Sequence, residues 1–82
     1  MVTGKGFEII VASLPDYQRL VAEIYYDGKF VLLISNEKSI ENFDVETPGS
    51  EMKEGALTHK VDLDGLKIAM DIACQKLKGE IS

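Results

Sequence analysis

The hydrophobic pattern of the chain is clearest between residues 20 and 35, where two apolar runs rich in β-branched and aromatic residues flank Asp27-Gly28. This dipeptide tolerates the positive φ angles of a type I′ turn, so the pattern predicts a tight β-hairpin. In a hairpin with a two-residue turn, strand pairing continues regularly outward from the turn. The expected pairs are Tyr26–Lys29, Tyr25–Phe30, Ile24–Val31, Glu23–Leu32, Ala22–Leu33 and Val21–Ile34.

Both faces of this hairpin are expected to be mostly apolar. Alternation assigns to one face Ala22, Ile24, Val31 and Leu33. It assigns to the other face Val21, Tyr25, Phe30, Leu32 and Ile34, with Glu23 as the single charge. An antiparallel sheet with one covering layer normally shows polar residues on its outer face. The sequence therefore predicts that residues 36–55 or a partner cover the second face.

Shorter runs predict the remaining strands. Residues 7–13 form an apolar run rich in β-branched residues, which predicts a central strand. Residues 15–19 are expected to form a turn after this strand, because Pro15 fixes φ and lacks an N–H donor. Residues 43–46 alternate in polarity and predict an edge strand, and residues 57–61 could add a short last strand. The sheet is thus expected to contain four to five antiparallel strands.

Apolar residues recur with helical spacing near the C-terminus and predict one amphipathic helix over residues 63–78. Asp62 or Asp64 is the expected N-cap, and Gly79 is the expected residue in the left-handed conformation after the helix. Ile72 lies at the flank of the apolar stripe and Ile68 lies further round. The stripe itself consists of Leu66, Ala69, Met70, Ala73 and Leu77.

These elements predict a single α+β domain over residues 1–82, with an antiparallel meander around the Asp27-Gly28 hairpin packed against one C-terminal helix. A chain of 82 residues has room for one hydrophobic core. The single cysteine, Cys74, favours a reducing compartment, because small secreted domains usually contain several disulfides. Residues 1–6 lack the apolar run of a signal peptide, and no segment has the length of a membrane span, which leads us to expect a cytoplasmic protein without membrane contact.

The residues that could carry chemistry are few, and we expect no enzymatic activity. His59 is the only histidine, and no spacing pairs it with Cys74 or with a serine as a catalytic unit. Two candidate zinc ligands far apart do not make a zinc site, and Asp62 and Asp64 are better explained by helix capping than by metal binding. We expect neither a metal nor a cofactor.

Negative charge is concentrated in residues 37–54. The net charge of the chain is -5, which argues against direct binding to nucleic acid and favours a basic protein as partner. A solvated loop and edge strand is the simpler explanation of the acidic residues, because edge strands and charge runs usually carry charge that faces solvent. The functional interpretation is a partner-binding surface in which tyrosines and a phenylalanine act as anchors. Its expected residues are Glu37, Glu41, Asp44, Glu46, Glu51, Glu54, Tyr25 and Phe30.

In its length, acidity, near absence of cysteine and expected order of strands plus one helix, the chain resembles small bacterial immunity proteins. The resemblance implies an immunity or antitoxin-like protein that masks the basic active site of a toxin, for which a nuclease is the natural candidate. The alternative is a homo-oligomeric structural or adaptor module, for instance a homodimer that buries its second apolar sheet face. A third interpretation places an apolar ligand between sheet and helix, although the two alanines of the stripe predict a close approach there.

Overall fold

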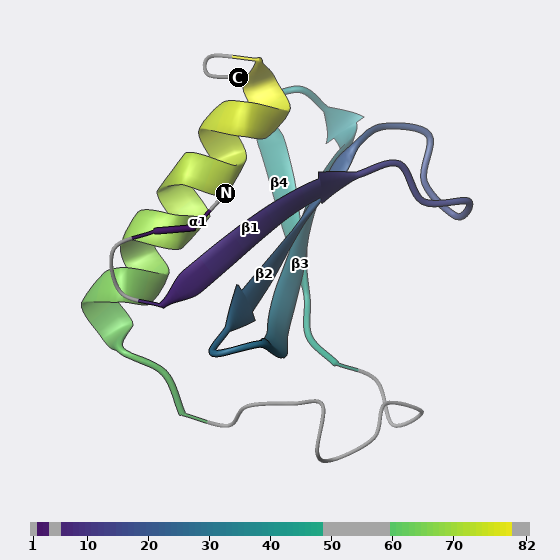
Figure 1. Ribbon diagram of the computed structural model, residues 1–82. Coiled ribbons are helices and arrows are strands. Elements are labelled where there is room, and N and C mark those ends of the chain that lie inside the picture. The colour runs from purple at the N-terminus through teal and green to yellow at the C-terminus, as the bar shows by residue number, and fades with distance from the viewer. Residues whose placement is uncertain (1, 4–5, 49–59, 80–82) are drawn as a thin grey trace.

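The protein is a four-stranded antiparallel sheet with one helix across one face (Figure 1). The computed structural model describes residues 2–3, 6–48 and 60–79. The strands are paired in chain order, which confirms the predicted α+β meander and its C-terminal helix. The elements are β1 (Phe7–Ala12), β2 (Val21–Tyr26), β3 (Lys29–Ser39), β4 (Asn42–Glu46) and α1 (Leu63–Lys78).

The order of the strands corrects one expectation about β1. This strand was predicted to be central, but it lies at one edge of the sheet and pairs only with β2 among the named strands. Val2 and Glu8 form an isolated bridge on its free side. β4 is the other edge, as predicted. The predicted strand at 57–61 falls mainly outside the described residues, and Lys60 and Val61 are not in a strand.

Helix α1 has the predicted bounds because both of its ends carry strong local signals. The Asp62 carboxylate accepts a hydrogen bond from the backbone N–H of Gly65 at 2.7 Å, which caps the N-terminus. Gly79 adopts a φ of 81° and donates its N–H to the carbonyls of Gln75 and Lys76, which ends the helix. The alanines of the stripe, Ala69 and Ala73, are fully buried and allow the helix to approach the sheet closely.

The hairpin between β2 and β3 has the predicted turn but not the predicted register. Asp27 and Gly28 have φ angles of 52° and 80°, as a type I′ turn requires. Beyond Tyr25–Phe30 a β-bulge leaves Val31 as an extra residue, so that Ile24 pairs with Leu32 rather than with Val31. All predicted pairs from Ile24 onward are therefore wrong by one residue.

The bulge determines which side chains form the core. Leu32 and Ile34 face α1 together with Ala22 and Ile24, whereas Leu33 faces away. Val31 to Ile34 are all apolar, so polarity does not distinguish the register with the bulge from the register without it. With the bulge, Leu32 and Ile34 face the helix. The buried core cluster consists of Phe7, Ile9, Ala22, Ile24, Leu32, Ile34, Ala69 and Ala73.

The second face of the sheet is covered in part by the loop between β1 and β2, residues 13–20. Leu14 to Tyr17 form the predicted turn, closed by a hydrogen bond from the Tyr17 N–H to the Leu14 carbonyl at 3.1 Å. The Tyr17 hydroxyl then donates to Glu46 on β4 at 2.6 Å. Under this crossing, Val21 and Leu33 are buried although neither belongs to the core cluster beneath α1. The segment 36–55 that was predicted to cover this face lies outside the described residues from residue 49 onward.

Candidate functional site: the outer face of the sheet

The sheet face opposite α1 carries carboxylates between apolar side chains. Strand pairing places Glu8 beside Tyr25, Ile10 beside Glu23, and Glu46 beside Leu33. The paired positions of β1 and β2 on this face carry no lysine or arginine, whereas Lys38 of β3 reaches Asp44. The positions of this face that strand pairing fixes are Glu8, Ile10, Ala12, Val21, Glu23, Tyr25, Phe30, Leu33, Ser35, Asp44 and Glu46.

One half of this outer face is occupied by the loop, which is held by two carboxylates. The two oxygens of Glu37 accept hydrogen bonds from the backbone N–H groups of Gln18 and Arg19, at 2.6 and 2.8 Å. The hydrogen bond to Glu46, followed by burial and nearby negative charge, raises the pKa of Tyr17 to about 12. Glu37 and Glu46 therefore act first as anchors for the chain's own loop.

The other half of the outer face lies toward the Asp27-Gly28 turn, and we name its residues the acidic aromatic patch: Glu8, Ile10, Glu23, Tyr25 and Phe30. The rings of Tyr25 and Phe30 meet edge to face, with centroids 5.7 Å apart and an angle of 71° between their planes. Both rings are half-buried, and Ile10 is 38% exposed. The patch thus offers apolar contact area that is open to solvent.

The charges of the patch surround its aromatic pair. Glu8 on β1 is exposed and pairs with Tyr25. Glu23 on β2 is half-buried and lies two residues from Tyr25 on the same face. Burial, followed by the negative charges of Glu23 and Glu8, raises the pKa of Tyr25, which keeps its hydroxyl protonated as a hydrogen-bond donor. The patch combines two carboxylate acceptors, one phenol and an apolar floor.

The structure places the predicted partner-binding residues in different parts of the fold. Tyr25 and Phe30 belong to the patch, whereas Asp44 lies on the same face near the loop and forms an ion pair with Lys38 at 3.3 Å. Glu41 is exposed in the turn between β3 and β4. The other predicted acidic residues are Glu37 and Glu46, which hold the loop, and Glu51 and Glu54, which lie outside the described residues.

Sequence reasoning missed Glu8 and Ile10 and gave Glu23 no role in binding. The search for charge followed the acidic segment, and Glu8 is far from that segment in the sequence. The signal was the alternation of β1, in which Phe7 and Ile9 are buried whereas Glu8 and Ile10 are exposed. Once β1 pairs with β2, this alternation brings Glu8 next to Tyr25.

Of the two residues with catalytic potential, His59 and Cys74, the structure describes only Cys74. His59 lies outside the described residues. Cys74 is half-buried in α1, where burial and then the charge of Asp71 raise the pKa of its thiol and thus disfavour the nucleophilic thiolate. Among the described residues, no three His, Cys, Asp or Glu side chains are grouped so that they could hold a metal ion. The outer face offers carboxylate acceptors, a phenol and apolar contact area.

Comparison with known proteins adds no relative to this picture. No family model, curated protein or solved structure matches the chain. No helix in the described part of the chain has the length and apolar character needed to cross a bilayer.

Proposed function

We propose that the chain is a non-catalytic protein-binding module that docks the acidic aromatic patch on a basic surface of another protein. The observation that carries the proposal is the edge-to-face pair of Tyr25 and Phe30 with Glu8 and Glu23 beside it. Masking of a basic active site, in the manner of an immunity protein or antitoxin, is the specific form of this role that the resemblance implies.

The patch combines the two features that protein interfaces use. Half-buried aromatic side chains give contact area at a small cost in conformational entropy, and they are enriched among the residues that dominate binding energy. Carboxylates beside them attract a basic partner over a distance and raise the rate of encounter. With a net charge of -5, the chain as a whole adds to this attraction.

Self-association through the same patch is less favourable. A dimer with twofold symmetry places one surface against itself, so Glu8 and Glu23 of one copy would approach the same carboxylates of the other. No lysine or arginine occupies a paired position of β1 or β2 on this face to neutralise them, and Lys38 of β3 is already paired with Asp44. The patch therefore fits a basic partner better than it fits a second copy of this chain.

The decisive experiment reverses the charge of the patch. The full chain is immobilised, a partner is captured from a lysate of the source cells and then purified, and its affinity is measured by calorimetry. The variant E8K/E23K should weaken binding by about 100-fold, because two attractive contacts become repulsive. E8K is an exposed substitution, usually worth under about 0.5 kcal/mol, whereas Glu23 is half-buried, so the thermal midpoint of the variant is measured beside its affinity to show that the fold persists.

A matched control separates local contact from total charge. D64K/D71K makes the same change in net charge on exposed positions of α1, on the other side of the molecule. The control should bind the partner within about threefold of the unmodified chain, because exposed charges beyond a Debye length are screened. Equal affinity of the two variants, or no captured protein that depends on the patch, would contradict the proposal. A dimer in light scattering that E8K/E23K disrupts would favour the homodimer instead.

A further inference from the structure

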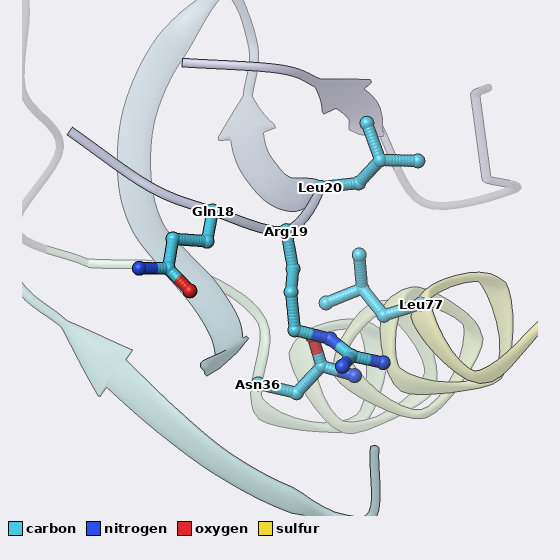
Figure 2. Close-up of a pocket in the computed structure, with 5 residues that line it drawn as sticks. All are labelled: Gln18, Arg19, Leu20, Asn36 and Leu77. Atoms are coloured by element: carbon cyan, nitrogen blue, oxygen red, sulfur yellow. The ribbon is translucent and has the colours of Figure 1, made fainter. Parts of the chain in front are cut away.

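A pocket of about 330 Å³ lies at the end of the sheet away from the Asp27-Gly28 turn, where the β1–β2 loop meets the C-terminal end of α1 (Figure 2). The loop, β3 and α1 each contribute to its wall. The pocket is separate from the acidic aromatic patch, because Asn36 and Leu77 come from the helix side of the sheet. Its lining residues are Gln18, Arg19, Leu20, Asn36 and Leu77.

The pocket contains the only arginine of the chain. The side chain of Arg19 extends from the loop toward Asn36 and Leu77 (Figure 2). Its backbone N–H is held by Glu37 at 2.8 Å, but its guanidinium makes no hydrogen bond or ion pair with the residues that the structure describes. A guanidinium that has a fixed backbone and no partner among the described residues can bind an anion.

The rest of the pocket is part polar and part apolar. Asn36 is 1% exposed, and its side-chain amide donates one hydrogen bond to the Ile40 carbonyl at 3.2 Å, which orients the group. An amide nitrogen has two hydrogens, so a second donor is left for a ligand. Leu77 packs against the core, and Leu20 is 53% exposed. The two leucines form an apolar wall beside the cationic head.

We propose that this pocket binds a monocarboxylate that carries a short aliphatic group. The Arg19 guanidinium takes the two carboxylate oxygens, Asn36 and Gln18 supply neutral hydrogen bonds, and Leu20 and Leu77 contact the aliphatic group. A phosphate would bring a charge of about -1.5 to -2, which one guanidinium in a chain of net charge -5 does not balance. A single negative charge fits the single cation.

The test is a titration of the isotope-labelled full chain, followed by NMR, with N-acetyl-leucine and with N-acetyl-leucinamide as matched probes. The acid should cause saturable shifts of the Arg19 side-chain Nε–H signal and of the Asn36 side-chain amide. The leucinamide has the same aliphatic group but no charge, so it should cause none. Shifts of equal size with both probes, or no saturable shift with the acid up to about 20 mM, would overturn the proposal.

Variants of the arginine decide whether the guanidinium is the ligand. R19Q should weaken binding of N-acetyl-leucine by about 10-fold or more. R19K keeps the charge but loses the bidentate geometry, so its affinity should lie between those of R19Q and the unmodified chain. Both variants retain the backbone N–H that Glu37 accepts, so the fold should persist. K29Q removes one exposed charge at the distant hairpin turn and should bind normally. Unchanged affinity in R19Q would overturn the proposal.

Two further probes distinguish the sources of such a carboxylate. Hexanoate represents a free aliphatic acid, and an acetylated pentapeptide ending in leucine represents a protein C-terminus. Stronger binding of the peptide would assign the pocket to a chain end, and stronger binding of hexanoate would assign it to a free acid. E8K/E23K should bind both as the unmodified chain does, which keeps this site independent of the protein-binding role.

Discussion

The two faces of the sheet are covered by different kinds of contact. Under α1, large aliphatic side chains such as Ile9 and Ile24 are 0–1% exposed and pack on two fully buried alanines. On the opposite face, the cover is a loop held by carboxylates that are themselves exposed to solvent, Glu37 and Glu46. Buried apolar contacts contribute several kcal/mol each, whereas exposed polar contacts contribute about 1 kcal/mol or less. The helix face therefore contributes more to the stability of the fold than the outer face does.

The largest effect is expected when a charge is placed in the core under α1, and two neighbouring residues of β3 that contact this core to different degrees test it. L32D should prevent folding, at a cost of more than about 4 kcal/mol, because Leu32 is 7% exposed and belongs to the core under α1. V31D should cost less, about 1–2 kcal/mol, since Val31 packs against the same core but is only half-buried as the extra residue of the bulge. Urea unfolding followed by circular dichroism measures both. A larger loss in V31D would indicate the bulge-free register instead.

A second test compares two isoleucines that are adjacent in β1 and point to opposite faces. I9A should reduce the free energy of unfolding by about 3 kcal/mol, because Ile9 is 1% exposed within the core. I10A should cost less than about 1 kcal/mol, because Ile10 is 38% exposed in the acidic aromatic patch. The same denaturation experiment gives both values. Similar losses would mean that the outer face carries as much of the stability as the helix face.

The elements that sequence alone predicts here are those with local signals. Asp27-Gly28 determines the hairpin turn, and Asp62 and Gly79 determine the ends of α1, because turns and caps depend on a few neighbouring residues. The register of β3 could not be predicted in the same way. Val31 to Ile34 are all apolar, so polarity alone cannot tell which of them faces the helix, and only packing against α1 decides.

The candidate site depends on contacts between distant segments, which limits its prediction further. Tyr25 and Phe30 were found because they face each other across one turn. Glu37 and Glu46 were expected to be free for a partner, but their role as loop anchors depends on where residues 13–20 cross the sheet. Glu8 reaches the patch only through the pairing of β1 with β2. A concentration of charge in the sequence does not show which charges the fold itself uses.

A third test removes the stronger of the two loop anchors. E37A should cost about 1–2 kcal/mol, because two backbone N–H groups lose a charged acceptor, although solvent can replace part of it. E41A removes an exposed carboxylate from the nearby turn and should change stability by less than about 0.5 kcal/mol. Hydrogen exchange should accelerate at the amides of Gln18 and Arg19 in E37A only. Unchanged exchange there would show that other contacts hold the loop.

The smallest expected effect comes from the second anchor, the hydrogen bond from Tyr17 to Glu46. Y17F keeps the ring and removes only the hydroxyl, so it should cost about 0.5–1 kcal/mol at neutral pH. The loop is also held by Glu37, so Val21 and Leu33 should stay covered. Urea unfolding at pH 7 measures the loss, and a cost above about 2 kcal/mol would mean that the outer face depends on this one contact.

The pH dependence of the same contact gives a sharper measurement. The hydrogen bond to Glu46 and burial raise the pKa of Tyr17 from 10.0 to about 12 in the folded chain. The folded state therefore holds this proton more tightly than the unfolded state, so the contribution is complete below pH 10 and disappears as the pH rises from 10 to about 12. The difference in unfolding free energy between the unmodified chain and Y17F should shrink over that interval. Lysines and Tyr25 also titrate at high pH, but they are common to both proteins and cancel in the difference. A constant difference up to pH 12 would show that Tyr17 does not donate to Glu46 in solution.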